Sequence, residues 1–125
     1  MPTLQRLLDT IREGKLLPAT MFDRDDRDDL LDQRDAEEFE RPWLACYNRI
    51  KEEWSAREPE QAATALMDEI RKESFLAVSR ATRQHEMASY VSDDFELIAK
   101  SIALDLNDEY ANGLLETYEQ GEIPK

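Results

Sequence analysis

Apolar side chains recur along the chain at intervals of three and four residues, which is the spacing of one face of an α-helix. The first such stripe lies in residues 4–11. The helix that it predicts ends at Gly14, a residue type that commonly terminates helices. The last stripe lies between Asn107 and Glu119, before Gly121. The pattern therefore predicts helices along most of the sequence, with glycine and proline marking their ends.

Large apolar side chains share one face of residues 39–54. They are Phe39, Trp43, Tyr47, Ile50 and Trp54, spaced four, four, three and four residues apart. Aromatic stripes with this spacing are typical of a helix that packs into a protein core, so we expect this face to be buried. Pro42 has no backbone N–H, and we expect it to end one helix near Glu40 and to begin the next.

Residues 60–89 contain neither proline nor glycine. They predict either one helix about 45 Å long, at 1.5 Å per residue, or two helices broken near Ser74. A seam of mostly small side chains follows this segment: Ala63, Met67, Ile70, Ser74, Ala77, Ala81, His85 and Ala88. Such a seam lets a neighbouring helix approach closely, so we expect a long central helix against which the aromatic face packs. A further helix is expected to begin at Ser92, with Asp93 and Asp94 in its first turn.

The composition agrees with the helical pattern. Two valines against fifteen leucines are poor material for a parallel sheet, and 125 residues fit one domain of ordinary size. We therefore predict an all-α, single-domain bundle of five or six helices over residues 1–125, with one long central helix. The sequence has no uncharged apolar run of about eighteen residues and no basic N-terminal region followed by an apolar stretch, so we expect a cytoplasmic protein.

The net charge of −13 is the extreme feature of the composition. Residues 23–40 hold ten acids and three arginines, net −7, and residues 84–124 hold ten acids and one lysine, net −9. Such a surface repels nucleic acid and anionic membranes and attracts basic proteins. The charge pattern therefore predicts a basic protein partner, with no direct contact to nucleic acid or to a membrane.

The sequence offers few side chains for catalysis or metal binding. Thr82 stands three residues before the single histidine, His85, so the Glu-x-x-His pair of di-metal bundles is absent. Residues 23–29 are rich in acids, but glycine is missing at the sixth position that an EF-hand loop requires. We expect no catalytic, metal-binding or cofactor-binding residue and no enzyme activity. Cys46 is expected to be a small core side chain, and His85 a hydrogen-bonded one.

Tyrosines and carboxylates alternate in the last third of the chain, where no basic side chain occurs between Lys100 and Lys125. This composition suits the capture of a basic partner, because tyrosine supplies a rigid anchor and acids pair with lysine or arginine. The candidate partner-binding residues are Tyr90, Asp93, Asp94, Glu96, Asp105, Asp108, Glu109, Tyr110, Glu116, Tyr118 and Glu119. Two interpretations stay open: this set forms an interface, or it is only the solvated face of two helices.

The run from Ala81 to Ile98, ATRQHEMASYVSDDFELI, leads into this acidic, tyrosine-bearing end. A small, cysteine-poor, acidic helical protein with this run resembles the immunity proteins encoded beside bacterial toxins. The resemblance implies a bacterial protein that neutralises a cognate basic toxin, most attractively a nuclease, by covering its surface. The chain is also similar in size and charge to phage DNA-mimic inhibitors, which implies the alternative of an inhibitor of a DNA-binding enzyme.

Two further classes of function stay open. A structural or regulatory subunit would form a homodimer through a contiguous exposed apolar stripe, and an enzyme would need a pocket with carboxylates converging on His85. Of the two acidic blocks, we expect the C-terminal one to dominate recognition. The reason is that Arg24, Arg27 and Arg34 can pair with acids of the first block, which would reduce its net field.

Overall fold

The structure, a computed structural model, describes residues 3–125 and contains six α-helices. The helices are α1 (Leu4–Arg12), α2 (Arg27–Asp35), α3 (Glu37–Arg57), α4 (Gln61–Thr82), α5 (His85–Ala103) and α6 (Glu109–Glu119), and a short 3₁₀ turn (Ala19–Phe22) follows α1. No strand occurs within residues 3–125. The prediction of an all-α bundle of five or six helices is confirmed. The described helices include none that is long and apolar enough to cross a membrane.

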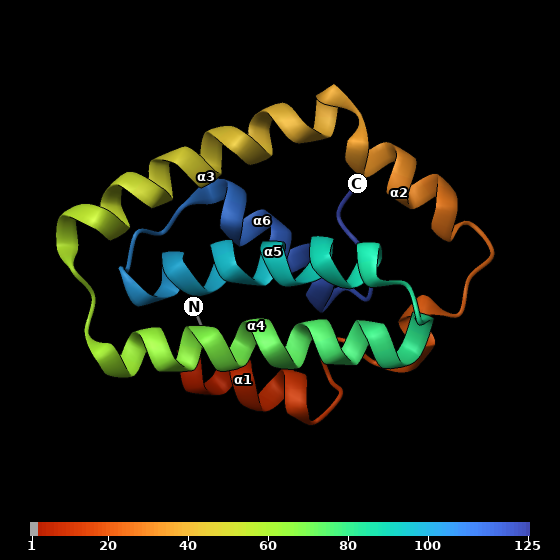
Figure 1. The fold of residues 1–125 in the computed structure, drawn as a ribbon, viewed down its shortest axis with the longest axis horizontal. Coiled ribbons are helices and arrows are strands. Elements are labelled where there is room, and N and C mark those ends of the chain that lie inside the picture. The colour runs from red at the N-terminus through yellow and green to blue at the C-terminus, as the bar shows by residue number, and fades with distance from the viewer. Residues whose placement is uncertain (1–2) are drawn as a thin grey trace.

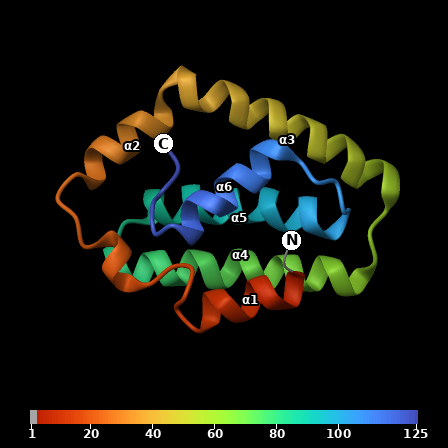
Figure 2. The same ribbon diagram turned by 180° about the vertical axis from the view of Figure 1, so that it is seen from behind.

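Helix α5 lies at the centre of the bundle, between α3 and α4 (Figure 1). It packs against α4, α6, α3 and α1, and ten of its side chains are buried, more than in any other helix. From the opposite side, α6 is seen to cross the front of α5 (Figure 2). The C-terminal residues then run toward the junction of α2 and α3. This junction consists of the single residue Ala36 between two helices, and together with the adjoining ends of α2 and α3 (residues 33–40) it is called the elbow below.

Helix α1 forms as its apolar stripe predicts. Thr3 caps it, because the threonine hydroxyl accepts a hydrogen bond from the backbone N–H of Arg6 at 3.1 Å. Gly14 then leaves the helix with φ +74°, a conformation that costs glycine little. The four buried side chains of α1 are Leu4, Leu7, Leu8 and Ile11, and they pack on α4.

The prediction that Pro42 separates two helices is wrong. The chain breaks at Ala36, which has an extended backbone (φ −71°, ψ 144°), and α3 continues through Pro42. Proline removes the hydrogen bond to the carbonyl of Glu38, and its ring crowds the same carbonyl. Because Glu38 and Pro42 are both exposed, this carbonyl can tilt toward solvent and be hydrated by water, so the helix continues despite the cost.

Residues 60–89 contain α4 and the first turn of α5, which runs antiparallel to α4, and the break falls at Arg83 rather than near Ser74. Arg83 adopts the left-handed conformation (φ 57°, ψ 21°). The hydroxyl of Thr82 donates to the carbonyl of Val78 at 2.8 Å and accepts from the N–H of Gln84 at 3.0 Å, so one side chain both closes α4 and supports the turn. The fold-back lets α5 bury its apolar face against α4.

Two expectations fail because of this turn. His85 begins α5 and is exposed, with its ring edge against Phe75 at 5.9 Å between ring centres, so it is not a core histidine. Ser92 lies in the middle of α5, where its hydroxyl donates to the carbonyl of Ser89, so it does not start a helix. Asp93 and Asp94 therefore lie in mid-helix, and adjacent positions of a helix point in different directions.

The aromatic face of α3 packs against α5 and α6, and the prediction that it packs on the seam of α4 is wrong. The surface of α4 is covered by α1 and α5 instead. Ile50 is fully buried, as its position on the stripe predicts, and Cys46 is buried as expected of a small core side chain. Trp43, Tyr47 and Trp54 are half-buried, because α3 lies on the outside of the bundle.

Candidate functional site

A buried ion pair joins Arg34 of α2 to Asp94 of α5. The two terminal guanidinium nitrogens of Arg34 donate to the two carboxylate oxygens of Asp94 at 2.7 and 2.8 Å. The indole N–H of Trp43 and the hydroxyl of Tyr118 donate to the same carboxylate at 2.9 and 2.6 Å. The side chains of Arg34 and Asp94 are 3% and 0% exposed, so the pair belongs to the interior.

This ion pair fixes the elbow against the rest of the molecule. Arg34 also donates to the carbonyl of Pro124 at 3.2 Å, which ties down the C-terminal segment. The guanidinium carbon of Arg34 lies 4.2 Å from the ring centre of Phe39 and 5.3 Å from that of Tyr90. Side chains of four helices and the C-terminal segment therefore hold one another in place around a single carboxylate.

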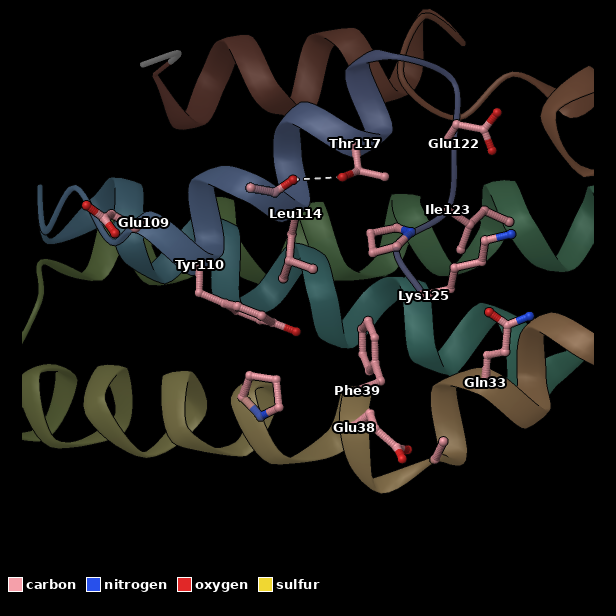
Figure 3. Close-up of a pocket in the computed structure, with 14 residues that line it drawn as sticks. Gln33, Glu38, Phe39, Glu109, Tyr110, Leu114, Thr117, Glu122, Ile123 and Lys125 are labelled. Carbon is pink, nitrogen blue, oxygen red and sulfur yellow. Dashed lines mark hydrogen bonds between the residues drawn. The ribbon is translucent and has the colours of Figure 1, made fainter.

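A groove lies between the elbow, α6 and the C-terminal segment (Figure 3). Its volume is about 840 Å³, and it is partly open to solvent. Phe39, Tyr110 and Leu114 point into it. Burial raises the pKa of Tyr110 to about 12, with a smaller contribution from Asp94, which further favours the neutral hydroxyl, a hydrogen-bond donor.

Acidic side chains stand at the margins of this groove. Glu38 lies on the elbow side, Glu109 at the beginning of α6, and Glu122 on the C-terminal segment, with Lys125 as the one basic lining residue. The groove thus combines an apolar floor with a mostly negative rim. That arrangement suits a protein segment carrying an apolar side chain flanked by basic ones.

Two of the eleven candidate partner-binding residues lie in the interior. Asp94 is 0% exposed and Tyr118 is 1% exposed. Burial raises the pKa of Tyr118 well above its ordinary value, and the neighbouring Asp94 adds to this effect. The expectation that these two side chains face a partner does not fit their burial, because both are used in the network around Arg34.

The carboxylate of Asp108 contacts three neighbouring groups within the fold. Its carboxylate caps α6 by accepting from the N–H of Ala111 at 3.0 Å, accepts from Arg49 at 3.1 Å and lies 3.4 Å from the Sγ of Cys46. Burial alone would raise the pKa of Asp108, but these contacts outweigh it and lower the pKa. The Cys46 thiol is buried beside this carboxylate, and burial raises its pKa to about 12.

Three other candidates lie on the outer side of α5 and are partly buried. Asp93 and Glu96 approach Arg71 at 3.9 and 3.6 Å, and Glu96 also pairs with Lys100 at 3.1 Å. Tyr90 donates a hydrogen bond to Asp35. The remaining candidates besides Tyr110 are exposed and have no ion-pair partner among residues 3–125: Asp105, Glu109, Glu116 and Glu119.

The first acidic block is less neutralised than the sequence suggests. Arg24 pairs with Asp26 as expected, but Arg34 leaves the block to pair with Asp94. Several acids of α2 and of the beginning of α3 are exposed without an ion pair in the described part of the chain: Asp28, Asp29, Asp32, Asp35, Glu38 and Glu40. Arg34 therefore does not reduce the field of the first block as expected, and acids of both blocks border the same groove.

The sequence did not identify the elbow as a surface of interest. The apolar spacing places Phe39 on a buried stripe, whereas Phe39 is half-buried and lines the groove. Leu44, the residue after Trp43 on α3, is the only large hydrophobic side chain that is exposed in residues 3–125, at 42%. The acids beside Phe39 and Leu44 could have indicated this surface, but only if the chain break at Ala36 could be predicted as well.

An acidic, all-helical bundle with an open groove has the features of a protein that binds another protein, and its described residues contain no group of three acidic, cysteine or histidine side chains placed to hold a metal ion. The model of the family Immunity protein PIM1 matches residues 6–125. The chain belongs to this family, and its function is therefore of the immunity type, directed at a partner toxin. No curated protein sequence matches the chain.

Proposed function

We propose that this protein neutralises a basic toxin, a nuclease being the favoured kind, by covering the toxin's positively charged surface with the groove between the elbow and α6. The observation that carries the proposal is the groove itself, with apolar side chains on its floor and carboxylates from both acidic blocks at its margins. Family membership supports the immunity function in general. The basic character of the toxin is inferred from the acids alone.

The charge distribution favours a basic partner. Glu38 and Glu109 border the groove and have no ion-pair partner in the described chain, so their fields extend into solvent. A nuclease must hold a polyanion and therefore presents a positive surface. Opposite charges on the two proteins would speed their encounter and fix their orientation, while like-charged proteins and nucleic acids would be repelled.

The floor of the groove supplies the apolar part of the interface. Phe39 is held in place by the guanidinium of Arg34, and Tyr110 can donate a hydrogen bond from a half-buried position. Aromatic side chains that are rigid before binding lose little entropy and often dominate interface energies. We infer that Phe39 and Tyr110 are the main anchors, with Glu109, Glu116 and Glu119 as the acids that orient the toxin.

The alternatives fit less well. A homodimerising subunit requires a contiguous exposed apolar stripe, whereas Leu44 stands alone among the large hydrophobic side chains of residues 3–125 as exposed. The DNA-mimic alternative shares the acidic surface, but the family match favours immunity. An enzyme centred on His85 would need converging carboxylates, and His85 instead lies exposed at the start of α5 against Phe75.

Co-expression with the toxin domain encoded beside the gene tests the proposal. Wild-type protein should restore growth, and the double variant Glu38→Lys/Glu109→Lys should weaken toxin binding by about tenfold or more, since two attractive charges become repulsive. The matched control is Glu52→Lys/Asp68→Lys, which changes the net charge equally at exposed acids outside the groove. Unchanged binding of the groove variant, or equal losses in both variants, would refute the proposed site.

A further inference from the structure

A second, smaller hollow lies on the other side of the elbow, between α3 and α5. Its volume is about 160 Å³. A cavity on the order of 150 Å³ can hold a benzene-sized group, so this hollow has room for one side chain rather than for a helix. Phe39, Trp43 and Tyr90 form its aromatic walls, and Leu44 also lines it.

The aromatic walls are fixed before any partner binds. Trp43 is anchored by its hydrogen bond to Asp94 at 2.9 Å and is stacked on Tyr47 with ring centres 5.7 Å apart. Tyr90 is held through its hydroxyl by Asp35. A hollow whose walls are already held in place loses little conformational entropy when it is filled.

The charge around this hollow is negative. Asp35, Glu40 and Asp93 line it. The positive charge of Arg34, which also lines it, is matched by the two-point contact with Asp94. Arg71 approaches Asp93 only at 3.9 Å and leaves Asp35 and Glu40 unpaired in the described residues. The guanidinium of Arg34 already lies against the rings of Phe39 and Tyr90, so the attraction for a second cation comes mainly from the carboxylates, which act strongly on a cation partly removed from water.

We infer that this hollow is a socket for one basic side chain, an arginine or a lysine, that projects from the toxin, with Leu44 packing against the toxin backbone beside it. The inference rests on the proposed immunity function for the identity of the partner. The groove and the socket flank the same elbow, and Phe39 lines both. One toxin surface can therefore engage both sites around the elbow.

The socket can be tested without the toxin. The intact protein is titrated with the N-acetyl methylamides of arginine, lysine and norleucine, and the indole N–H signals of Trp43 and Trp54 are followed by NMR. The arginine or the lysine amide should shift the Trp43 signal in a saturable way, while Trp54, far along α3, and the neutral norleucine amide serve as controls. Glu40→Gln should weaken this binding severalfold, and the matched variant Glu52→Gln on the same helix should not.

Equal shifts with norleucine, equal shifts at Trp54, or no shift with either basic amide would overturn the socket. The toxin then separates the two proposals. Leu44→Ala and Glu40→Lys should weaken toxin binding, and wild-type strength in both variants would refute the socket as a toxin contact while leaving the groove in place. A toxin that is not bound at all, together with a socket that still binds the basic amides, would refute the proposed function only.

Discussion

Asp94 accepts four hydrogen bonds from three side chains at a point that water does not reach. Removing either member of a buried ion pair leaves the other charge unmatched, which typically costs about 3–5 kcal/mol. We therefore expect Asp94→Asn and Arg34→Met each to lower the free energy of unfolding by several kcal/mol, as measured by urea denaturation.

The double variant provides the control for this pair. Arg34→Met/Asp94→Asn removes both charges, so no unmatched charge is left inside. Its loss of stability should be smaller than the sum of the two single losses by about 1 kcal/mol or more. Losses that simply add would mean that the two residues act independently, against the network described around them.

Asp108 gives a prediction in pH. Its pKa is lowered in the folded protein from an ordinary value of 3.8, because the Ala111 N–H and Arg49 outweigh the effect of burial. A group with a depressed folded pKa stabilises the fold at pH above its unfolded pKa, and that stabilisation is lost as the pH falls through the folded pKa. Asp108→Asn keeps a capping side chain but loses the charge, so it should cost about 1 kcal/mol at pH 7.

The difference in the free energy of unfolding between Asp108→Asn and wild type should shrink below pH 4. It should vanish once Asp108 of the wild type is neutral in the folded protein. Urea unfolding at a series of pH values measures it. Glu119→Gln, an exposed acid on the same helix without an ion pair in the described residues, is the matched control and should show little pH-dependent difference. A deficit of Asp108→Asn that does not shrink as the pH falls below 4 would contradict the assigned cause.

Asp93 and Asp94 show how much the sequence predicts about a single site residue. Asp93 and Asp94 look equivalent in the sequence, yet one is partly exposed and the other is completely buried. The difference depends on Arg34, which lies 60 positions away and comes close only after the bundle forms. Local charge pattern predicted the acidic surface correctly near Glu109, and it could not detect a long-range ion pair that removes an arginine from its own block.

At the scale of helices, apolar periodicity predicted α1 and α6 closely, because each has a strong stripe and a clear signal at one end, Gly14 or Asp108. It failed at two breaks. Pro42 does not end a helix, since a proline on an exposed helix face can be accommodated, and the break at Arg83 has no signal in the sequence, since nothing in its residue type favours a left-handed turn. Tertiary packing of α5 on α4 decides that second break.

Arg83 yields a prediction at this scale. A residue with a Cβ in the left-handed conformation costs about 1–2 kcal/mol, and glycine avoids this cost but loses some entropy on folding. We expect Arg83→Gly to be more stable than Arg83→Ala by up to about 1 kcal/mol, as measured by thermal unfolding. Comparing the two variants cancels the loss of the arginine side chain. Equal stability would indicate that the α4–α5 turn is not strained.

At the scale of the whole molecule, folding brings together acids that are distant in the sequence. The blocks at residues 23–40 and 84–124 appear separate in the sequence, but Glu38 and Glu109 border one groove because the elbow and α6 lie side by side. Net charge was available from composition alone. Composition could not predict that the two blocks meet, because their meeting depends on how α2, α3 and α6 pack around Asp94.

The association rate with the purified toxin domain, measured by stopped-flow fluorescence across a salt series, tests the central claim most directly. If the acidic groove attracts a basic toxin, the rate constant should fall by about tenfold or more as the Debye length shrinks from about 10 Å at 0.1 M salt to about 3 Å at 1 M. Glu38→Lys/Glu109→Lys should associate more slowly and depend less on salt, and Glu52→Lys/Asp68→Lys should stay closer to wild type. An association rate indifferent to salt, or equally slowed in both variants, would contradict recognition through the groove.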